Sequence, residues 1–207
     1  MKLQHLAPLA LIALTSAAFA DGFYGIGEIT RSSPSLDKDY FDAALTGNGA
    51  SGLSSRDDHN GTQWRLQGGY RFNPYLAIEA GYIEFGTAKY KANYAGGSAH
   101  GSLKAGGVDV VGLASLPLND NFSVFGKAGL VYANVKSSLT ASDPAALASD
   151  NNSTRVVRPL LGVGANYKIT QNVDLRADFD HVSGLGKSST TGKMNDNMFS
   201  LGLAYNF

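Results

Sequence analysis

Hydrophobic and polar residues alternate with a period of two in eight separate stretches of this chain. In the second stretch Trp64, Leu66 and Phe72 fall on one face, whereas Arg65 and Arg71 fall on the other. A period of two indicates a β-strand, because successive side chains of a strand point to opposite sides. Each stretch has about ten residues, enough for a tilted strand to cross a membrane. The eight stretches are 23–30, 62–72, 76–85, 105–116, 122–133, 159–169, 173–182 and 198–207.

Charged residues avoid one face of these stretches. The stretches contain twelve charged residues, and all of them except Glu84 lie on the face opposite the large apolar side chains. Two folds produce this pattern. A soluble β-sandwich would bury the apolar face, whereas a transmembrane barrel would turn it toward lipid. The even number of stretches favours the barrel, because single-chain bacterial barrels have even strand numbers.

The amino-terminal residues favour the membrane interpretation. Lys2 precedes an apolar run over 6–14, and Ala18 and Ala20 form the small-x-small pattern at which signal peptides are cleaved. The run has nine residues, whereas a helix that spans a membrane needs about twenty. We therefore predict a signal peptide at 1–20, export through the inner membrane, and one barrel domain at 21–207.

The links between the stretches alternate in length. The short links are 73–75, 117–121 and 170–172, and the long links are 31–61, 86–104, 134–158 and 183–197. Outer-membrane barrels have short periplasmic turns and long external loops. The predicted fold is therefore all-β: an eight-stranded antiparallel up-and-down transmembrane β-barrel. We expect it to lie in the bacterial outer membrane, in contact with outer-membrane lipid and lipopolysaccharide.

Aromatic residues and the last stretch add two signals. Aromatic side chains near both ends of the strands predict girdles at the two membrane interfaces. The girdle residues are Phe23, Phe72, Phe122 and Tyr167 on the periplasmic side and Trp64, Tyr82, Tyr132 and Phe179 on the outer side. The apolar face of the last stretch ends in an aromatic residue, which matches the signal that the barrel-assembly machinery reads. The residues of this assembly signal are Phe199, Leu201, Leu203, Tyr205 and Phe207.

Composition narrows the range of functions. The chain has 17 basic and 17 acidic residues and so lacks the cationic excess of a protein that binds nucleic acid. The absence of cysteine excludes disulfides and thiolate chemistry. The 25 glycines among 207 residues exceed the usual share of about 7% and suit the crowded wall of a small barrel. We expect a monomer without cofactor or metal.

Two segments carry a family resemblance. The runs 68–82 and 197–207 closely resemble the outer-membrane protein A transmembrane-barrel family. The similarity also includes Lys127 and the run 159–176, so it reaches essentially every strand and none of the long links. The resemblance implies a small eight-stranded barrel. Larger members of the family carry a peptidoglycan-binding domain after the barrel, but this chain stops at Phe207, so we expect no anchoring to peptidoglycan.

The predicted lumen carries opposed charges. The inward positions supply five basic and six acidic residues, which is close to balance. Side chains fill the lumen of an eight-stranded barrel, and an unpaired buried charge costs several kcal/mol. We therefore predict mutual pairing and a plugged lumen. The lumen charge cluster consists of Glu28, Arg65, Arg71, Glu79, Asp109, Lys127, Arg176 and Asp178.

The resemblance also bears on this cluster. Glu79 and Arg176 stand at positions that match opposed interior charges of the family, and we expect them to meet within salt-bridge distance. Leu113 and Asn166 stand where the family often has a second lysine and glutamate, which thins the network. The alternative to a plugged lumen is a narrow water-filled pore, because a few side-chain rotations would open one.

A catalytic interpretation rests on three residues. His181, Ser183 and Asp196 resemble the histidine, serine and acid of outer-membrane lipid A deacylases. Gly184 replaces the asparagine that usually follows the serine, and His181 lies on the lipid-facing side of its stretch. We therefore expect these three side chains not to converge.

An acidic cluster lies in the first long link. Asp37, Asp39 and Asp42 lack the glycine and the terminal glutamate of a calcium-binding loop. We interpret this segment as a solvated loop.

The leading hypothesis for the whole chain is a non-enzymatic outer-membrane barrel that presents surface loops and supports envelope integrity. A low-conductance porin is the alternative, and a lipid A-modifying enzyme ranks third.

Overall fold

The computed structural model describes residues 22–36, 38–59, 61–142 and 150–207. The predicted signal peptide at 1–20 lies outside these residues. The described chain forms nine strands and one helix. The elements are β1 (Phe23–Leu36), α1 (Asp39–Gly47), β2 (Ser54–His59), β3 (Thr62–Asn73), β4 (Leu76–Tyr94), β5 (Gly97–Pro117), β6 (Phe122–Ala141), β7 (Asp150–Lys168), β8 (Val173–Lys187) and β9 (Gly192–Asn206).

The strands close into a ring with eight strand positions. Each strand pairs antiparallel with its neighbours, and β9 closes the ring against β1, with Ile29 opposite Leu201. The additional strand β2 shares a position with β3, because β3 pairs with the first part of β4 and β2 pairs with the last part, from Ser54 opposite Asn93 to His59 opposite Ala88. The predicted eight-stranded antiparallel barrel is therefore confirmed, with one strand position divided between two segments.

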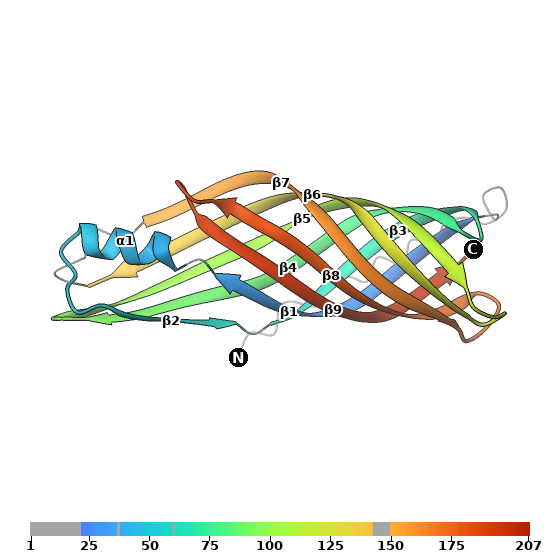
Figure 1. Cartoon of the computed structure of the whole chain (residues 1–207), viewed down its shortest axis with the longest axis horizontal. Helices are drawn as coiled ribbons and strands as arrows, with labels where there is room; N and C mark the ends of the chain where they lie inside the picture. Colours follow the sequence, from blue (N-terminus) through green and yellow to red (C-terminus); the bar gives the residue numbers. More distant parts are fainter. Residues whose placement is uncertain (1–21, 37, 60, 143–149) are drawn as a thin grey trace, which may run out of the picture.

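The two ends of the barrel differ (Figure 1). Both described ends of the chain meet at one end of the barrel, where the Phe207 amide donates a hydrogen bond to the Phe23 carbonyl over 3.2 Å. The short turns that follow β3, β5 and β7 lie at this end, which corresponds to the periplasmic side by the rule of short turns. The helix α1 lies at the opposite, outer end.

The outer half of the barrel corrects the prediction of long external loops. The links predicted at 86–104, 134–158 and 183–197 consist largely of strand, and only Ala95 and Gly96 separate β4 from β5. The reason is an inversion of the hydrophobic pattern. On β6, Tyr132 faces outward within the membrane-spanning part, but farther out Lys136 faces outward and Val135 faces the lumen. Polar and apolar residues therefore still alternate in the outer part of the strands, but there the apolar residues face the lumen and not lipid.

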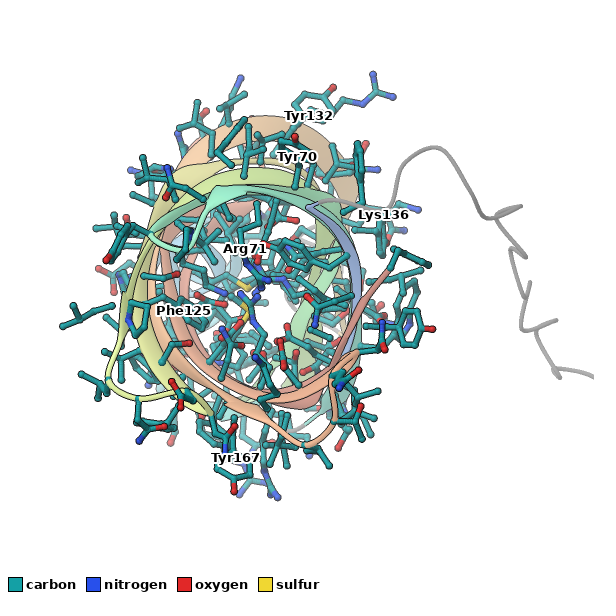
Figure 2. All side chains as sticks on the ribbon, turned by 90° about the vertical axis from the view of Figure 1, so that its right-hand side faces the viewer. Tyr70, Arg71, Phe125, Tyr132, Lys136 and Tyr167 are labelled. Atoms are coloured by element: carbon teal, nitrogen blue, oxygen red, sulfur yellow. The ribbon has the colours of Figure 1, made fainter. Side chains whose placement is uncertain are left out.

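The outer wall of the membrane-spanning part is apolar. Trp64 and Leu66 are 51% and 60% exposed, whereas Arg65 between them is 1% exposed. Figure 2, a view along the barrel, shows Tyr132 and Tyr167 pointing outward from the ring. The exposed girdle and assembly-signal residues are Phe23, Trp64, Phe72, Tyr82, Tyr132, Tyr167, Phe179, Phe199, Leu201, Leu203, Tyr205 and Phe207, and Phe122 is partly exposed. A soluble sandwich would bury these side chains, so this alternative is excluded.

Neighbouring strands approach closely at glycines. A Cβ atom at Gly129 on β6 would lie 2.0 Å from the carbonyl oxygen of Val110 on β5. A Cβ atom at Gly202 on β9 would lie 2.1 Å from the carbonyl oxygen of Gly27 on β1. Only glycine permits this approach, and glycines at such points let a sheet bend enough to close a small barrel.

No helix within the described ranges is long and apolar enough to span a membrane.

Candidate functional site

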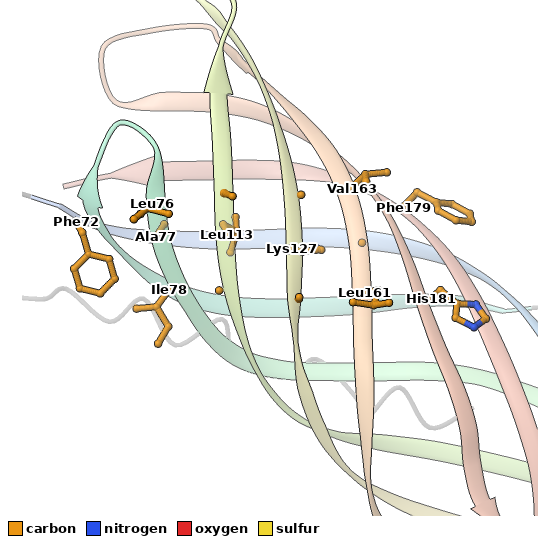
Figure 3. A pocket seen from close by; sticks show the side chains of 15 residues that line it. Phe72, Leu76, Ala77, Ile78, Leu113, Lys127, Leu161, Val163, Phe179 and His181 are labelled. Carbon is orange, nitrogen blue, oxygen red and sulfur yellow. The ribbon is translucent and has the colours of Figure 1, made fainter.

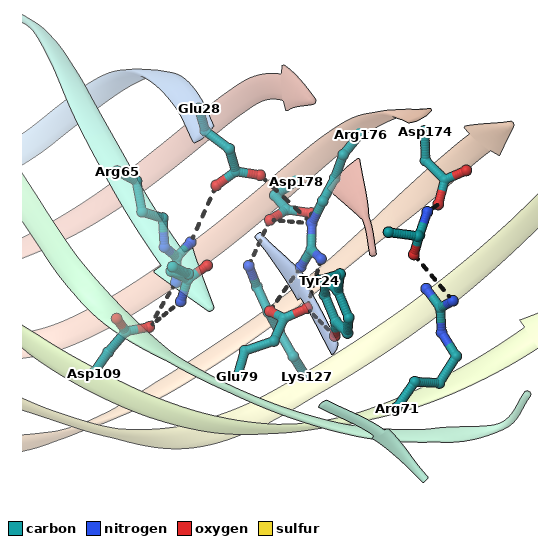
Figure 4. A network of polar contacts seen from close by, with 12 residues as sticks. Tyr24, Glu28, Arg65, Arg71, Glu79, Asp109, Lys127, Asp174, Arg176 and Asp178 are labelled. Atoms are coloured by element: carbon teal, nitrogen blue, oxygen red, sulfur yellow. Dashed lines mark hydrogen bonds and ion pairs between the residues drawn. The ribbon is translucent and has the colours of Figure 1, made fainter. Parts of the chain in front are cut away.

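An ion pair crosses the centre of the lumen (Figure 4). Arg176 on β8 and Glu79 on β4 stand on opposite sides of the ring and meet through two contacts, Nη1 to Oε1 at 2.6 Å and Nη2 to Oε2 at 3.0 Å. The Tyr24 hydroxyl donates to the same Glu79 Oε1 over 2.7 Å. The Arg176 guanidinium lies over the Phe125 ring, 4.5 Å from its centroid. This pair was the one expected from the sequence, and it is present.

A second set of ion pairs lies next to the first. Arg65 Nη1 contacts Asp180 Oδ2 at 2.5 Å, and Arg65 Nη2 contacts Asp109 Oδ2 at 2.8 Å. Lys127 Nζ joins the two sets, because it lies 2.7 Å from Asp178 Oδ2 and 2.9 Å from Asp180 Oδ2. Arg176 Nε also lies 3.2 Å from Asp178 Oδ1. The lumen charges therefore form one continuous network that links strands on all sides of the barrel.

The buried part of the network contains fewer basic residues than the sequence predicted. Its buried members are three basic side chains, Arg65, Lys127 and Arg176, and five acidic side chains, Glu28, Glu79, Asp109, Asp178 and Asp180. Arg71, a member of the predicted lumen charge cluster, is exposed at the periplasmic rim. So is Lys168, the fifth of the five basic residues at inward positions of the predicted strands. The alternating pattern correctly predicted that both side chains are on the lumen-facing side of their strands. Both positions, however, lie at the end of the barrel, where the lumen-facing side is open to solvent.

Arg71 is the one member of the predicted charge cluster that lies apart from the network. Its Nη1 donates to Asn206 Oδ1 over 3.3 Å, and its guanidinium lies 5.1 Å from the centroid of the Tyr24 ring. Tyr24 and Gln67 are members of the network that sequence reasoning missed, since only charged residues were considered. Gln67 Nε2 donates to Asp109 Oδ2 over 2.7 Å. Both residues occupy inward positions in the alternating pattern, and that position could have identified them as lumen residues.

The lumen becomes apolar toward the outer end. A group of buried aliphatic, aromatic and thioether side chains continues along the strands from the charge network toward α1. At the transition, Asp196 Oδ1 accepts a hydrogen bond from Ser32 Oγ over 2.5 Å, and Asp196 Oδ2 accepts one from the Gly86 amide over 3.2 Å. The apolar layer includes Leu36, Phe85, Leu103, Val135, Leu185 and Met194.

Helix α1 closes the outer mouth of the barrel. Phe41 and Leu45, one helical turn apart, are both fully buried. The Phe41 ring stacks on the Tyr90 ring with centroids 4.9 Å apart and planes 22° apart. The Tyr90 hydroxyl donates to the Asp42 carboxylate, and Ser55 Oγ donates to Asp42 Oδ2 over 3.0 Å. Burial, together with the hydrogen bond to Asp42, raises the pKa of the Tyr90 hydroxyl above its ordinary value.

The interpretation of this segment as a solvated loop was wrong. Asp39 and Asp42 occupy the first turn of α1, where carboxylates interact favourably with the helix dipole. Asp37 lies outside the described residues. The apolar pair Phe41 and Leu45 at helical spacing was the signal for a buried helix face. In the described part of the chain, no cluster of His, Asp and Glu side chains could hold a metal ion.

The three residues of the catalytic interpretation do not converge. Asp196 faces the lumen and is fully buried. His181 stands on the outer wall, where its Nδ1 lies 2.7 Å from Asn197 Oδ1. Asp196 is in register with Val182, so His181 and Asp196 project from opposite faces of the wall. Ser183 therefore lacks the histidine and acid arrangement that would activate its hydroxyl.

A surface depression lies along the wall of the barrel from β3 to β8 (Figure 3). Small residues on β5 and β6, including Gly112 and Ala128, form its floor. Large side chains such as Ile78 and Leu161 stand on both sides. The groove is apolar, and it exists because small residues on the outer wall lie between larger side chains.

Comparison with known proteins agrees with this architecture. A family model described as OmpA-like transmembrane domain matches residues 40–207. An uncharacterized protein of Coxiella burnetii is 30% identical over 215 residues, which cover 90% of this chain and 85% of that protein. Outer membrane protein A of Serratia marcescens is 34% identical over 140 residues, which cover 67% of this chain but only 37% of that protein.

Solved structures share the fold. Neisserial surface protein A has a TM-score of 0.58 at 18% identity, with 90% of this chain and 98% of that chain covered. Ail, the attachment invasion locus protein of Yersinia pestis, has a TM-score of 0.52 at 16% identity, with 90% and 99% covered. These similarities place the chain among the bacterial outer-membrane barrels.

Proposed function

We propose that this protein, which belongs to the family of OmpA-like transmembrane domains, is a closed barrel that presents a folded cap at the cell surface and supports the envelope. It neither conducts ions nor catalyses a reaction. The observation that carries this proposal is the filling of the lumen at three successive levels. The levels are the charge network around Arg176, the apolar layer, and the buried face of α1.

Each level opposes the passage of a hydrated ion. At the first level the ion would have to separate Arg176 from Glu79, and both side chains are buried. At the second level it would have to leave water for surroundings such as Phe85 and Leu103, which offer no polar group to replace its hydration shell. These barriers favour the closed barrel over the narrow porin.

The outer extension supplies the presented surface. Strand β5 has 21 residues, and at a rise of about 3.3 Å per residue and a tilt of about 45° it spans about 50 Å of height. The apolar band of an outer-membrane barrel is about 25 Å tall. About 25 Å of the height of β5 therefore lies outside the apolar band. Strands and the helix α1 form this extension, so the surface it offers is a folded cap.

The partners that we propose follow from the wall and from the last strand. The exposed apolar side chains of the wall would contact outer-membrane lipid and lipopolysaccharide. The outward aromatic and leucine residues of β9, together with Phe207 directly after it, would be read by the barrel-assembly machinery. We propose a monomer, because the ring pairs every strand position within one chain.

Solute uptake in cells distinguishes the closed barrel from the porin, because the two functions predict opposite effects of deletion. The gene is deleted in the source bacterium, and the rate at which a small chromogenic β-lactam reaches a periplasmic β-lactamase is measured. Loss of a structural barrel weakens the envelope, so uptake and leakage of periplasmic enzyme rise, and the intact gene restores both. Slower uptake after deletion would contradict the proposal and support a porin.

A further inference from the structure

Three cations and an amide form a patch on the outer wall above the girdle. The patch, which we call the basic patch, consists of Lys104 on β5, Asn134 and Lys136 on β6, and Arg155 on β7, and all four side chains are exposed. Lys104 is directly opposite Lys136, and Asn134 is directly opposite Arg155. Figure 2 shows Lys136 pointing away from the barrel. The patch therefore crosses three adjacent strands.

This arrangement is unfavourable for the protein alone. Like charges directly opposite each other on neighbouring strands destabilise a sheet. Glu84 faces outward on β4, but it is in register with Gly106, two residues along β5 from Lys104. No ion pair joins a patch cation to a carboxylate within the residues that the structure describes. The repulsion between Lys104 and Lys136 is thus left without a partner from the protein.

The height of the patch matches the polar region of a membrane. Tyr132, in the outer girdle, is in register with Val108 on β5 and with Val157 on β7. Lys136 lies four residues outward from Tyr132 on the same strand. Lys104 and Arg155 lie on the two neighbouring strands, opposite Lys136 and Asn134. At about 3.3 Å per residue and about 45° of tilt, Lys136 stands roughly 9 Å above Tyr132. The headgroup region of a bilayer is about that thick.

We propose that the basic patch binds the phosphate groups of an anionic lipid in the outer leaflet. The proposal rests on the proposed function, since it names one of the lipids that the barrel contacts. Arg155 presents a planar fork of donors suited to phosphate oxygens, the two lysines contribute point charges, and the Asn134 amide adds a neutral donor. A phosphate between Lys104 and Lys136 converts their repulsion into shared attraction.

Lipid titration tests the proposal. Refolded protein in neutral detergent is titrated with bisphosphorylated lipid A or with enzymatically dephosphorylated lipid A, and bound lipid is resolved by native mass spectrometry. The wild type prefers the phosphorylated lipid. In the variant Lys104→Gln/Lys136→Gln/Arg155→Gln the affinity for that lipid falls by at least about tenfold, since each cation near an anionic surface contributes about 1 kcal/mol, or about fivefold. Inorganic phosphate added in excess competes weakly in the wild type.

A matched variant controls for total charge. Arg56→Gln/Lys187→Gln/Lys193→Gln removes three exposed cations from other strands, and its affinity for phosphorylated lipid A stays within about threefold of the wild type if the site is local. Equal binding of both lipids by the wild type would overturn the proposal, as would equal loss in the two variants. Complete competition by inorganic phosphate at equal concentration would show a free-anion site and would also overturn it.

A single substitution gives a second readout that is independent of folding defects. In neutral detergent Lys136→Gln relieves the repulsion and raises the unfolding temperature. In micelles that contain phosphorylated lipid A, the same substitution lowers it. A purely structural role would give the same sign in both, and that result would overturn the proposal. The conductance of the barrel does not enter either experiment, so failure here leaves the closed-barrel proposal standing.

Discussion

Arg176 and Glu79 form a two-contact ion pair between opposite strand positions of the ring, with nitrogen to oxygen distances of 2.6 and 3.0 Å. A contact between neighbouring strands would stabilise only their local pairing. This pair fixes β8 relative to β4 across the full width of the lumen. We therefore expect the pair to contribute both to closure of the barrel and to occlusion of its interior.

Loss of Arg176 is the first prediction. Arg176→Ala leaves the buried Glu79 carboxylate without its cation, and such losses typically cost about 3–5 kcal/mol. Urea unfolding in lipid vesicles measures the change. The control is Arg56→Ala, because Arg56 is exposed on β2, and it should change the free energy of unfolding by less than about 0.5 kcal/mol. Equal stabilities of the two variants would show that the pair does not hold the barrel together.

The second prediction concerns close strand approach. Gly129→Ala places a Cβ atom against the Val110 carbonyl oxygen and should lower stability by about 1–3 kcal/mol, as overpacking does. Gly126→Ala on the same strand is the matched control, because a Cβ atom there meets nothing within 4 Å. Folding yield in vesicles, read from heat-modifiable migration on gels, compares the two. Equal yields would argue against a steric requirement for glycine at Gly129.

The third prediction concerns the seal at the outer mouth. Phe41→Ala removes a fully buried ring that stacks on Tyr90, and truncation of a buried phenylalanine costs about 3–5 kcal/mol. We expect faster hydrogen exchange in the amides of α1, with little change in the membrane-spanning strands. Thr46→Ala, at an exposed position of the same helix, should leave exchange nearly unchanged. Equal exchange rates of the α1 amides in the wild type and in Phe41→Ala would mean that this ring does not anchor the helix.

The fourth prediction is a pH dependence of the same contact. The raised pKa of Tyr90 in the folded protein favours the neutral hydroxyl. Its contribution to stability is therefore present below the unfolded value of about 10 and is lost as the pH rises above it. The stability advantage of the wild type over Tyr90→Phe should shrink between about pH 9 and about pH 12. A constant difference over that range would contradict the proposed role of the hydroxyl.

Much of the membrane-spanning part was predictable from the sequence, because alternation with lipid-facing apolar residues determines both the strand and the side of each residue. The same rule failed farther out, where Val135 and Lys136 exchange the roles that apolar and polar residues have in the membrane. Alternation also gave the inward side for Arg71 but not its depth along the barrel axis. Depth depends on strand stagger, which sequence alone does not provide.

The sequence predicted most of the residues that belong to the charge network, but few of the contacts between them. Glu79 and Arg176 were expected to meet, and they do. The contact of Lys127 with both Asp178 and Asp180 depends on side-chain reach across the lumen, and no sequence pattern specifies it. Helix α1 was missed because Asp39 and Asp42 were considered as a group of charges, apart from the apolar spacing of Phe41 and Leu45.

Single-channel recording in planar bilayers tests the central claim, which is that three filled levels close the lumen. Refolded wild-type protein is added to one chamber, with a general porin as the positive control and Phe41→Ala/Arg176→Ala as the opened variant. We predict no sustained current steps for the wild type and measurable steps for the double variant. Sustained steps from the wild type, unchanged by the double substitution, would contradict the closed barrel and identify the protein as a pore.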